Sequence, residues 1–194
     1  DENIEWSVPV SSEEIEKARN GEWEIILTPI KPVPREWFGD VRGKDILCLA
    51  SGGGQQAPIL AAAGANVTSF DASAKQLEKD RFVAERDNLE IRIEQGDAAD
   101  LSRFADESFD LIFHPCSNCF MEKLQPIWNE CYRVLRKSGV LLSAFNQPFI
   151  YMYDLEAEEN EGVLKLMHKL PYSDSESLSE DEKKKKIEKN EPFE

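Results

Sequence analysis

The alternation of apolar and polar residues along the chain predicts strands separated by helices. Apolar runs of strand length begin at Asp45 and span 67–70, 91–97, 109–115 and 139–145, whereas helical patterns reach Ala63 and span 74–86 and 127–135. Parallel strands joined by helices form sheets that are covered on both faces. The pattern therefore predicts an α/β fold with a doubly wound, mostly parallel sheet.

The first of these runs passes directly into three glycines, Gly52, Gly53 and Gly54, and then into a helical pattern. Glycine has no Cβ and tolerates positive φ, so the backbone can turn sharply there and a ligand can lie against it. The segment predicts a strand, a ligand-binding turn and a helix. An ordinary loop is the alternative for the glycines taken alone.

Acidic residues follow the next strands at a spacing that suits a ligand site. Asp71 ends the second strand, about 20 residues after the glycine turn, and Asp97 ends the third. Ligands of open parallel sheets bind at the carboxyl ends of the strands, where a carboxylate can accept hydrogen bonds from ribose hydroxyls. We expect the site at this edge, between the first and fourth strands, where the strand order reverses.

Four ordered motifs between Lys44 and Phe145 carry a resemblance to a known family: LASGGG, SFDAS, QGDAADL and DESFDLIF, followed by a helix end and strand in YRVLRKSGVLL. In this order they resemble class I S-adenosylmethionine-dependent methyltransferases with a type 11-like methyltransferase domain. The resemblance implies a Rossmann-like sheet and methyl transfer from S-adenosylmethionine. It also implies a sixth and a seventh strand, which nothing after Gln147 matches, so these C-terminal strands are expected to be missing.

Matched position by position, the resemblance implies a set of cofactor-binding residues. The backbone from Ala50 to Gly54 would pass the methionine and ribose portions, and Asp71 would hold the ribose hydroxyls. Asp97 and the Ala98 amide would bind adenine. The complete set, in which the last two lie near the methyl group, is Ala50, Ser51, Gly52, Gly53, Gly54, Asp71, Ala72, Gln76, Asp97, Ala98, His114 and Pro115.

The match has two departures in the first strand and turn. Cys48 stands where the family commonly has an acid, and Ala50 stands where it has a glycine. Gln55 and Gln56 are the neighbours that could replace the hydrogen bonds of the missing acid, and cofactor binding is still expected.

The expected chemistry is an in-line attack of a nucleophile on the sulfonium methyl group, for which the protein mainly positions the reactants. A base is needed only if the acceptor begins protonated. His114 is the histidine near the expected methyl position and is the candidate general base. The alternative is a loop histidine that makes a structural hydrogen bond.

The segments on either side of this core are expected to be accessory. Residues 1–43 predict a helical cap or lid and a linker, with Ser11 or Ser12 as the helix cap and Gly21 near its end. Residues 44–147 form the core, and 148–194 an acidic extension of helices and loops that is not a separate domain. The N-terminal part also holds side chains that either cover the site or pack in the core, namely Trp6, Trp23, Trp37 and Phe38, and linker prolines at Pro29, Pro32 and Pro34.

Composition and charge limit the classes of partner that the chain is expected to bind. The 194 residues are 41% apolar and 31% charged, with a formal net charge of −15, which fits one globular domain and disfavours phosphate backbones as substrates. The basic run Lys183 to Lys186 is flanked by acids and predicts a solvated helix face. No apolar run is long enough to span a membrane, and no basic-then-apolar signal opens the sequence. We expect a cytoplasmic protein that acts on a small molecule.

Cysteine and histidine spacing leaves metal and redox chemistry as minor alternatives. His114, Cys116 and Cys119 lie close together, but Cys48 and Cys131 supply no second paired spacing. A structural zinc site takes four ligands, so no metal is expected.

Two other functions stay open. A nicotinamide-dependent oxidoreductase would use a similar strand, turn and acid, although SGGGQQ lacks the GxGxxG spacing. A non-catalytic S-adenosylmethionine-binding or scaffold protein is compatible with the changes at Cys48 and Ala50.

Overall fold

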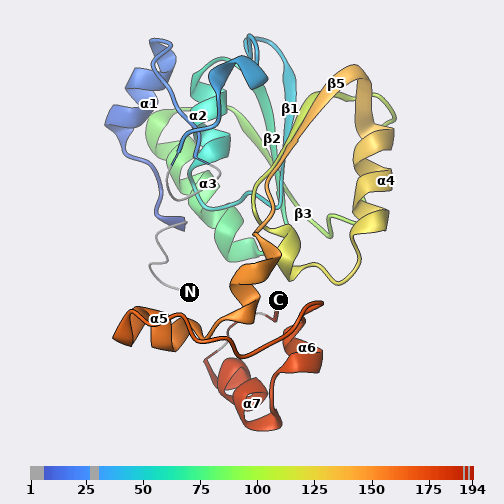
Figure 1. The fold of residues 1–194 in the computed structure, drawn as a ribbon. Coiled ribbons are helices and arrows are strands. Elements are labelled where there is room, and N and C mark those ends of the chain that lie inside the picture. Colours follow the sequence, from blue (N-terminus) through green and yellow to red (C-terminus); the bar gives the residue numbers. More distant parts are fainter. Residues whose placement is uncertain (1–6, 27–30, 190, 192) are drawn as a thin grey trace. The chain divides into compact units, whose positions relative to one another are not determined.

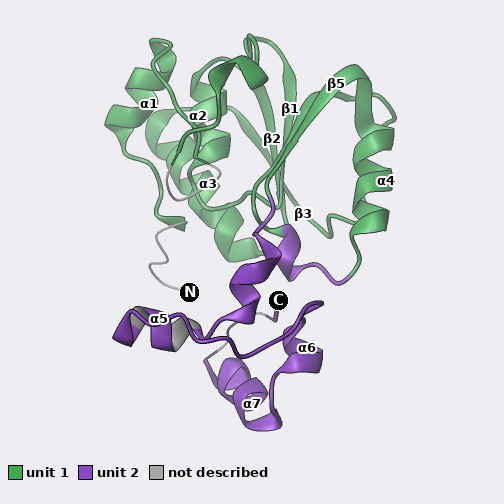
Figure 2. Cartoon of the chain, in the orientation of Figure 1, with its two compact units in different colours: residues 1–117, 123–144 green, residues 118–122, 145–194 purple. Residues whose placement is uncertain are grey.

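The structure is a computed structural model that describes residues 7–26, 31–189, 191 and 193–194, so Trp6 and Pro29 lie outside the described residues. The chain divides into two compact units, residues 1–117 with 123–144 and residues 118–122 with 145–194 (Figure 2). The boundary at 144/145 lies close to the expected core limit at 147. Residues 7–26 and 31–43, expected as a cap and linker, belong to the first unit.

The first unit contains a five-stranded sheet with the order β3-β2-β1-β4-β5, in which neighbouring strands are parallel. Leu47 of β1 lies between Thr68 of β2 and Ile112 of β4. The α/β class and the parallel sheet are confirmed, and the order reverses between β1 and β4. The strands are β1 (Asp45–Leu49), β2 (Asn66–Asp71), β3 (Ile91–Gln95), β4 (Phe109–His114) and β5 (Leu135–Ser143).

Helices of the first unit lie on both sides of this sheet (Figure 1). Three of them, α1, α2 and α3, lie on one side, and α4 lies on the other. Helical spacing gives each of these helices an apolar stripe that is buried, such as Ile127, Cys131 and Val134 in α4. The bounds are α1 (Ser12–Arg19), α2 (Gln56–Ala62), α3 (Ala74–Asp87) and α4 (Leu124–Val134), with a short 3-10 helix η2 (Arg35–Trp37).

A core cluster of buried residues joins α1, α2 and α3 to β1 and β4. Of the aromatic residues that were expected either to cover the site or to pack, Trp23 and Phe38 belong to this core, and Phe38 stacks on Phe113 of β4. Trp37 is 57% exposed. Ser11 caps α1 and forms a capping box with Glu14, as the serine and acid spacing predicts.

The fifth strand differs from its prediction. It begins at Leu135 rather than 139, directly after α4, and therefore includes the polar residues Arg136 and Lys137. Its register with β4 is interrupted between Phe109 and Leu111, and Ser138 adopts a left-handed φ of 66°. An irregular strand of this kind does not show the period of two on which the prediction relied.

The second unit consists of short helices and loops, with one isolated antiparallel bridge between Tyr153 and Leu166. Tyr151 stacks on Tyr172, whose hydroxyl donates to Asp174 at 2.7 Å, and Lys186 lies 2.7 Å from the same carboxylate. Its helices are η3 (Asn118–Phe120), η4 (Pro148–Met152), α5 (Leu155–Glu161), α6 (Asp174–Ser177) and α7 (Glu180–Glu188). That the C-terminal extension is not a separate domain stays a prediction.

Candidate functional site

The residues expected to bind the cofactor lie at one edge of the sheet, where β1 to β4 end. Ala50 follows β1, Asp71 is the last residue of β2, Asp97 lies two residues beyond β3, and His114 is the last residue of β4. Parallel strands bring these positions to the same edge because their carboxyl ends point in one direction.

The turn after β1 needs small residues for two separate reasons. Gly53 and Gly54 have φ values of 140° and 76°, which side chains with a Cβ rarely adopt. Gly52 has no such φ, but a Cβ on it would lie 2.8 Å from the Cβ of Gln76. Ala50 adopts a φ of 49°, so alanine occupies a left-handed position where the family has glycine.

Asp71 holds the outer part of this turn. Its Oδ2 accepts a hydrogen bond of 3.0 Å from the Gly52 amide, and its Oδ1 accepts one of 2.8 Å from the Ser73 amide. The side chain is only partly buried. A carboxylate has about four lone-pair positions, so Asp71 retains capacity to accept from ligand hydroxyls.

A second acid, Asp80 of α3, holds the turn from the buried side. Oδ1 accepts a hydrogen bond of 2.7 Å from the Gly54 amide, and Oδ2 accepts one of 2.5 Å from Ser69 Oγ. The residue is fully buried, and burial raises the pKa of its carboxyl group to about 6 despite these hydrogen bonds. Burial, with the Asp80 charge as a second cause, also raises the pKa of the Cys48 thiol.

Asp80 was not identified from the sequence. Residues 74–86 have the pattern of a charged amphipathic helix, within which one more acid is unremarkable. The available signal was position: Asp80 lies on the same helix face as Leu77, Val83 and Ala84, all of them buried. An acid on the apolar face of a helix is a candidate for a specific buried role.

The loops after β2 and β3 are joined beside this turn. The Gly96 amide donates to the Asp71 carbonyl oxygen at 3.1 Å, and Gln95 Nε2 donates to the Ala72 carbonyl oxygen at 2.9 Å. Asp97 is exposed and accepts from the Ala99 amide at 2.9 Å. Ala72 is exposed, and Ala98 is buried.

His114 lies inside the sheet edge. Its Nδ1 is 2.9 Å from the Leu49 carbonyl oxygen, and its ring packs edge-on against Trp128 of α4. The side chain has no exposed surface, and burial lowers the pKa of the imidazole. Within the described residues Nε2 has no hydrogen-bond partner. Pro115, the next residue, is partly buried.

The segment from Ser7 to Val10 runs along the glycine turn. The Val10 amide donates to the Gly54 carbonyl oxygen at 2.8 Å, and Lys79 Nζ donates to the Ser7 carbonyl oxygen at 2.7 Å. These contacts place part of the N-terminal region beside the expected site.

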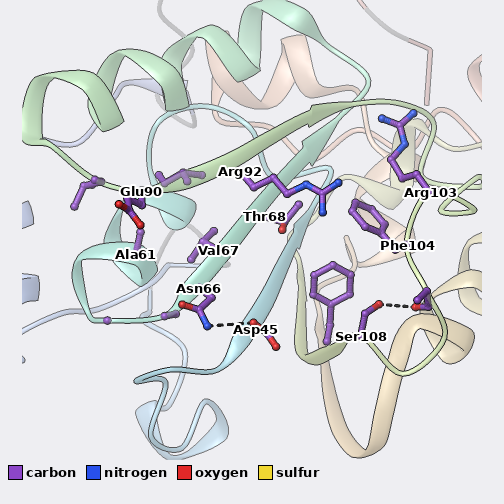
Figure 3. Close-up of a pocket in the computed structure, with 16 residues that line it drawn as sticks. Asp45, Ala61, Asn66, Val67, Thr68, Glu90, Arg92, Arg103, Phe104 and Ser108 are labelled. Atoms are coloured by element: carbon purple, nitrogen blue, oxygen red, sulfur yellow. Dashed lines mark hydrogen bonds between the residues drawn. The ribbon is translucent and has the colours of Figure 1, made fainter.

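A surface hollow of about 980 Å³ lies elsewhere (Figure 3). It is lined by Asp45, Asn66, Ile91 and Phe109, the first residues of four strands. The hollow is therefore at the amino ends of the strands, opposite the edge that carries the glycine turn, and we do not assign the cofactor to it.

The Methyltransferase domain family matches residues 47–143, which span this sheet and turn. The chain belongs to this family, the class I S-adenosylmethionine-dependent methyltransferases. It is 52% identical over 190 residues to the uncharacterized methyltransferase YbaJ of Bacillus subtilis (strain 168), covering 98% of this chain and 74% of the relative. It is 27% identical over 118 residues to the uncharacterized protein Rv1405c of Mycobacterium tuberculosis, covering 61% of this chain and 43% of that protein.

Solved structures agree with the fold. The PH0226 protein of Pyrococcus horikoshii OT3 is 30% identical with a TM-score of 0.53, over 57% of this chain and 49% of that one. An S-adenosylmethionine-dependent methyltransferase from Mesorhizobium loti is 21% identical with a TM-score of 0.54, and the match covers 70% of this chain and 72% of that one. The Rossmann-like class expected from the motifs is confirmed.

The described residues contain neither a metal-binding cluster nor a membrane-spanning helix. No group of three or more histidine, cysteine, aspartate and glutamate side chains in that part of the chain is arranged to hold a metal ion. Across the same residues, no helix has both the length and the apolar character needed to cross a membrane.

Proposed function

We propose that this chain transfers a methyl group from S-adenosylmethionine to a small-molecule acceptor by in-line displacement. The observation that carries the proposal is that the backbone amides of the glycine turn donate to carboxylates. The amides of Gly52 and Gly54 donate to the carboxylates of Asp71 and Asp80, at 3.0 and 2.7 Å. In nucleotide sites that bind phosphate, such amides face the phosphate oxygens instead.

Because the Gly52 and Gly54 amides already donate to carboxylates, they do not face outward to bind a pyrophosphate, and this arrangement disfavours NAD(P). It suits a cofactor without phosphate groups that carries positive charge on a sulfonium and an ammonium group. A further feature fits a polar ligand: Gln76 Oε1 is buried beside Gly53 and has no hydrogen-bond partner within the described residues. The residues present therefore fit S-adenosylmethionine.

In this proposal each residue of the sheet edge has a binding role. Asp71 accepts hydrogen bonds from the ribose hydroxyls while it continues to hold Gly52. The backbone from Ala50 to Gly54 lies along the methionine and ribose portions, and Ala72, Gln76, Asp97 and Ala98 surround adenine. Fixing donor and acceptor in an attack geometry accounts for a large part of the rate of such displacements.

S-Adenosylmethionine supplies an electrophilic methyl group when bound. His114 is the candidate base of the chain, with Pro115 beside it. The lowered pKa of His114 keeps the imidazole neutral at pH 7, and its Nε2 is available as an acceptor. Its complete burial supports the structural alternative, because a base has to reach the proton it removes.

The charge of the chain supports a small-molecule acceptor over nucleic acid. The formal net charge of −15 opposes the approach of nucleic acid. Within α7 the basic run is partly neutralised, since Lys183 pairs with Glu180 at 2.9 Å and Lys186 with Asp174 at 2.7 Å.

Calorimetry tests the proposal. We expect S-adenosylmethionine and its demethylated product to bind and NAD to give no signal. Binding of NAD without a response to either methionine cofactor would overturn the assignment. If S-adenosylmethionine binds but no demethylated product forms when mixtures of candidate small-molecule acceptors are added, a non-catalytic binding protein would be favoured.

A further inference from the structure

We propose that Asp80 is a positioning residue that holds the glycine turn in the conformation that binds the cofactor. The proposal rests on the proposed function. It concerns how the turn is fixed, because Asp80 itself is fully buried and lies behind the turn.

One carboxyl group joins three elements at this point. Asp80 belongs to α3, Ser69 to β2, and Gly54 to the turn that follows β1. Cys48 of β1 pairs in register with Ser69, and both are fully buried. The carboxyl group therefore fixes the position of the turn relative to β1 and β2.

The turn requires such an anchor because its own backbone is permissive. Gly53 and Gly54 both have positive φ, and glycine samples these and many other conformations without a steric penalty. Asp71 fixes the amide of Gly52 from the exposed side, and Asp80 fixes the amide of Gly54 from the buried side. Together they hold both ends of the three-glycine segment.

Packing alone does not explain an acid at this position. Burial of a carboxylate is costly unless hydrogen bonds compensate for it, and an apolar side chain would pack against Leu77 and Val83 without that cost. The bonds that compensate at Asp80 go to Ser69 and to the turn. The feature that an apolar residue could not supply is acceptance of the Gly54 amide hydrogen.

The test compares three variants by calorimetry with S-adenosylmethionine, with melting temperatures measured in parallel. Asp80→Ala removes the acceptor and should weaken binding about tenfold or more, since it leaves the buried Gly54 amide without a partner. Asp80→Asn should stay within about threefold, because its side-chain oxygen can accept from Gly54 and its NH₂ group can donate to Ser69. Val83→Ala, on the same buried helix face, is the control for lost packing.

The outcomes are separable. Unchanged affinity in Asp80→Ala would overturn the proposal, as would equal losses in Val83→Ala at a matched melting temperature or in Asp80→Asn. Hydrogen exchange of the Gly54 amide supplies a readout without ligand: it should accelerate in Asp80→Ala and not in Val83→Ala. If the unaltered protein does not bind S-adenosylmethionine, the proposed function fails, and the exchange result still decides whether Asp80 fixes the turn.

Discussion

His114 Nδ1 lies 2.9 Å from the Leu49 carbonyl oxygen and so joins the last residue of β4 to the last residue of β1. These two strands flank the point where the strand order reverses. A carbonyl oxygen only accepts, so this contact places the proton on Nδ1 and leaves the Nε2 lone pair available. The same contact serves a base and a structural histidine, and substitution can separate the two roles.

His114→Asn tests them because its side-chain amide can keep the bond to Leu49 while it removes Nε2. If Nε2 takes the acceptor proton, turnover should fall by about 10²-fold or more, with cofactor affinity within about twofold. Turnover of the unaltered protein should then be flat above pH 6.5 and fall at lower pH, since burial lowers the pKa of His114. Equal turnover in both proteins would identify a structural hydrogen bond.

Asp71→Ala should weaken S-adenosylmethionine binding strongly. The variant loses charge-assisted hydrogen bonds to the ribose hydroxyls, which contribute about 1.5–3 kcal/mol each, and the restraint on Gly52. Calorimetry gives the affinity, and circular dichroism checks that the fold survives. Asp100→Ala is the matched control, because Asp100 is exposed and makes a similar local bond to the Ser102 amide. An unchanged dissociation constant would remove Asp71 from the site.

The sheet and the edge that carries the site were predictable because both depend on local pattern. Apolar runs marked the strands, and parallel connection placed Asp71 and His114 at one edge. The start of β5 was not predictable, since its first residues are polar and its pairing with β4 is irregular. The ends of a strand can be predicted from a short apolar run only where the strand pairs regularly with its neighbour.

Asp80 was not predictable as part of the site for a different reason. Its partners, Ser69 and Gly54, lie 11 and 26 residues away in the sequence, so no local motif links them. Only the packing of α3 against β2 brings the three together. The family resemblance offered no help, because it pointed to the strand position now occupied by Cys48.

Gly52→Ala should impair the turn through contact alone. Gly52 has an ordinary φ, but the added Cβ would lie 2.8 Å from Gln76 Cβ and 3.2 Å from Asp71 Oδ2. Relief of that overlap requires α3 or the turn to move, at a cost of about 1–3 kcal/mol of stability. We expect a clear loss of S-adenosylmethionine affinity by calorimetry.

Gly21→Ala provides the comparison for Gly52→Ala. Gly21 has a φ of 85° and nothing within 4 Å of an added Cβ, so alanine there adds about 1–2 kcal/mol of backbone strain without a clash. Gly21→Ala should lower the free energy of unfolding and leave the affinity for S-adenosylmethionine unchanged. Equal affinities in the two variants would show that the turn tolerates displacement.

Asp80 should also make the free energy of unfolding depend on pH in an unusual direction. Burial raises the pKa of Asp80 from 3.8 to about 6. The folded protein therefore holds this proton more tightly than the unfolded chain does. The stability that Asp80 contributes is greatest below pH 3.8, declines as the pH rises toward 6, and is lowest above pH 6.

Asp80→Asn should then stabilise the protein at pH 8 by up to about 3 kcal/mol, and by less at pH 5. Urea unfolding of both proteins at the two pH values measures this. The difference between proteins is the informative quantity, because carboxylates such as Glu130, whose hydrogen bond with Arg133 lowers its pKa, act in the opposite direction. A gain that does not change between pH 5 and pH 8 would contradict an ionised Asp80 behind the glycine turn.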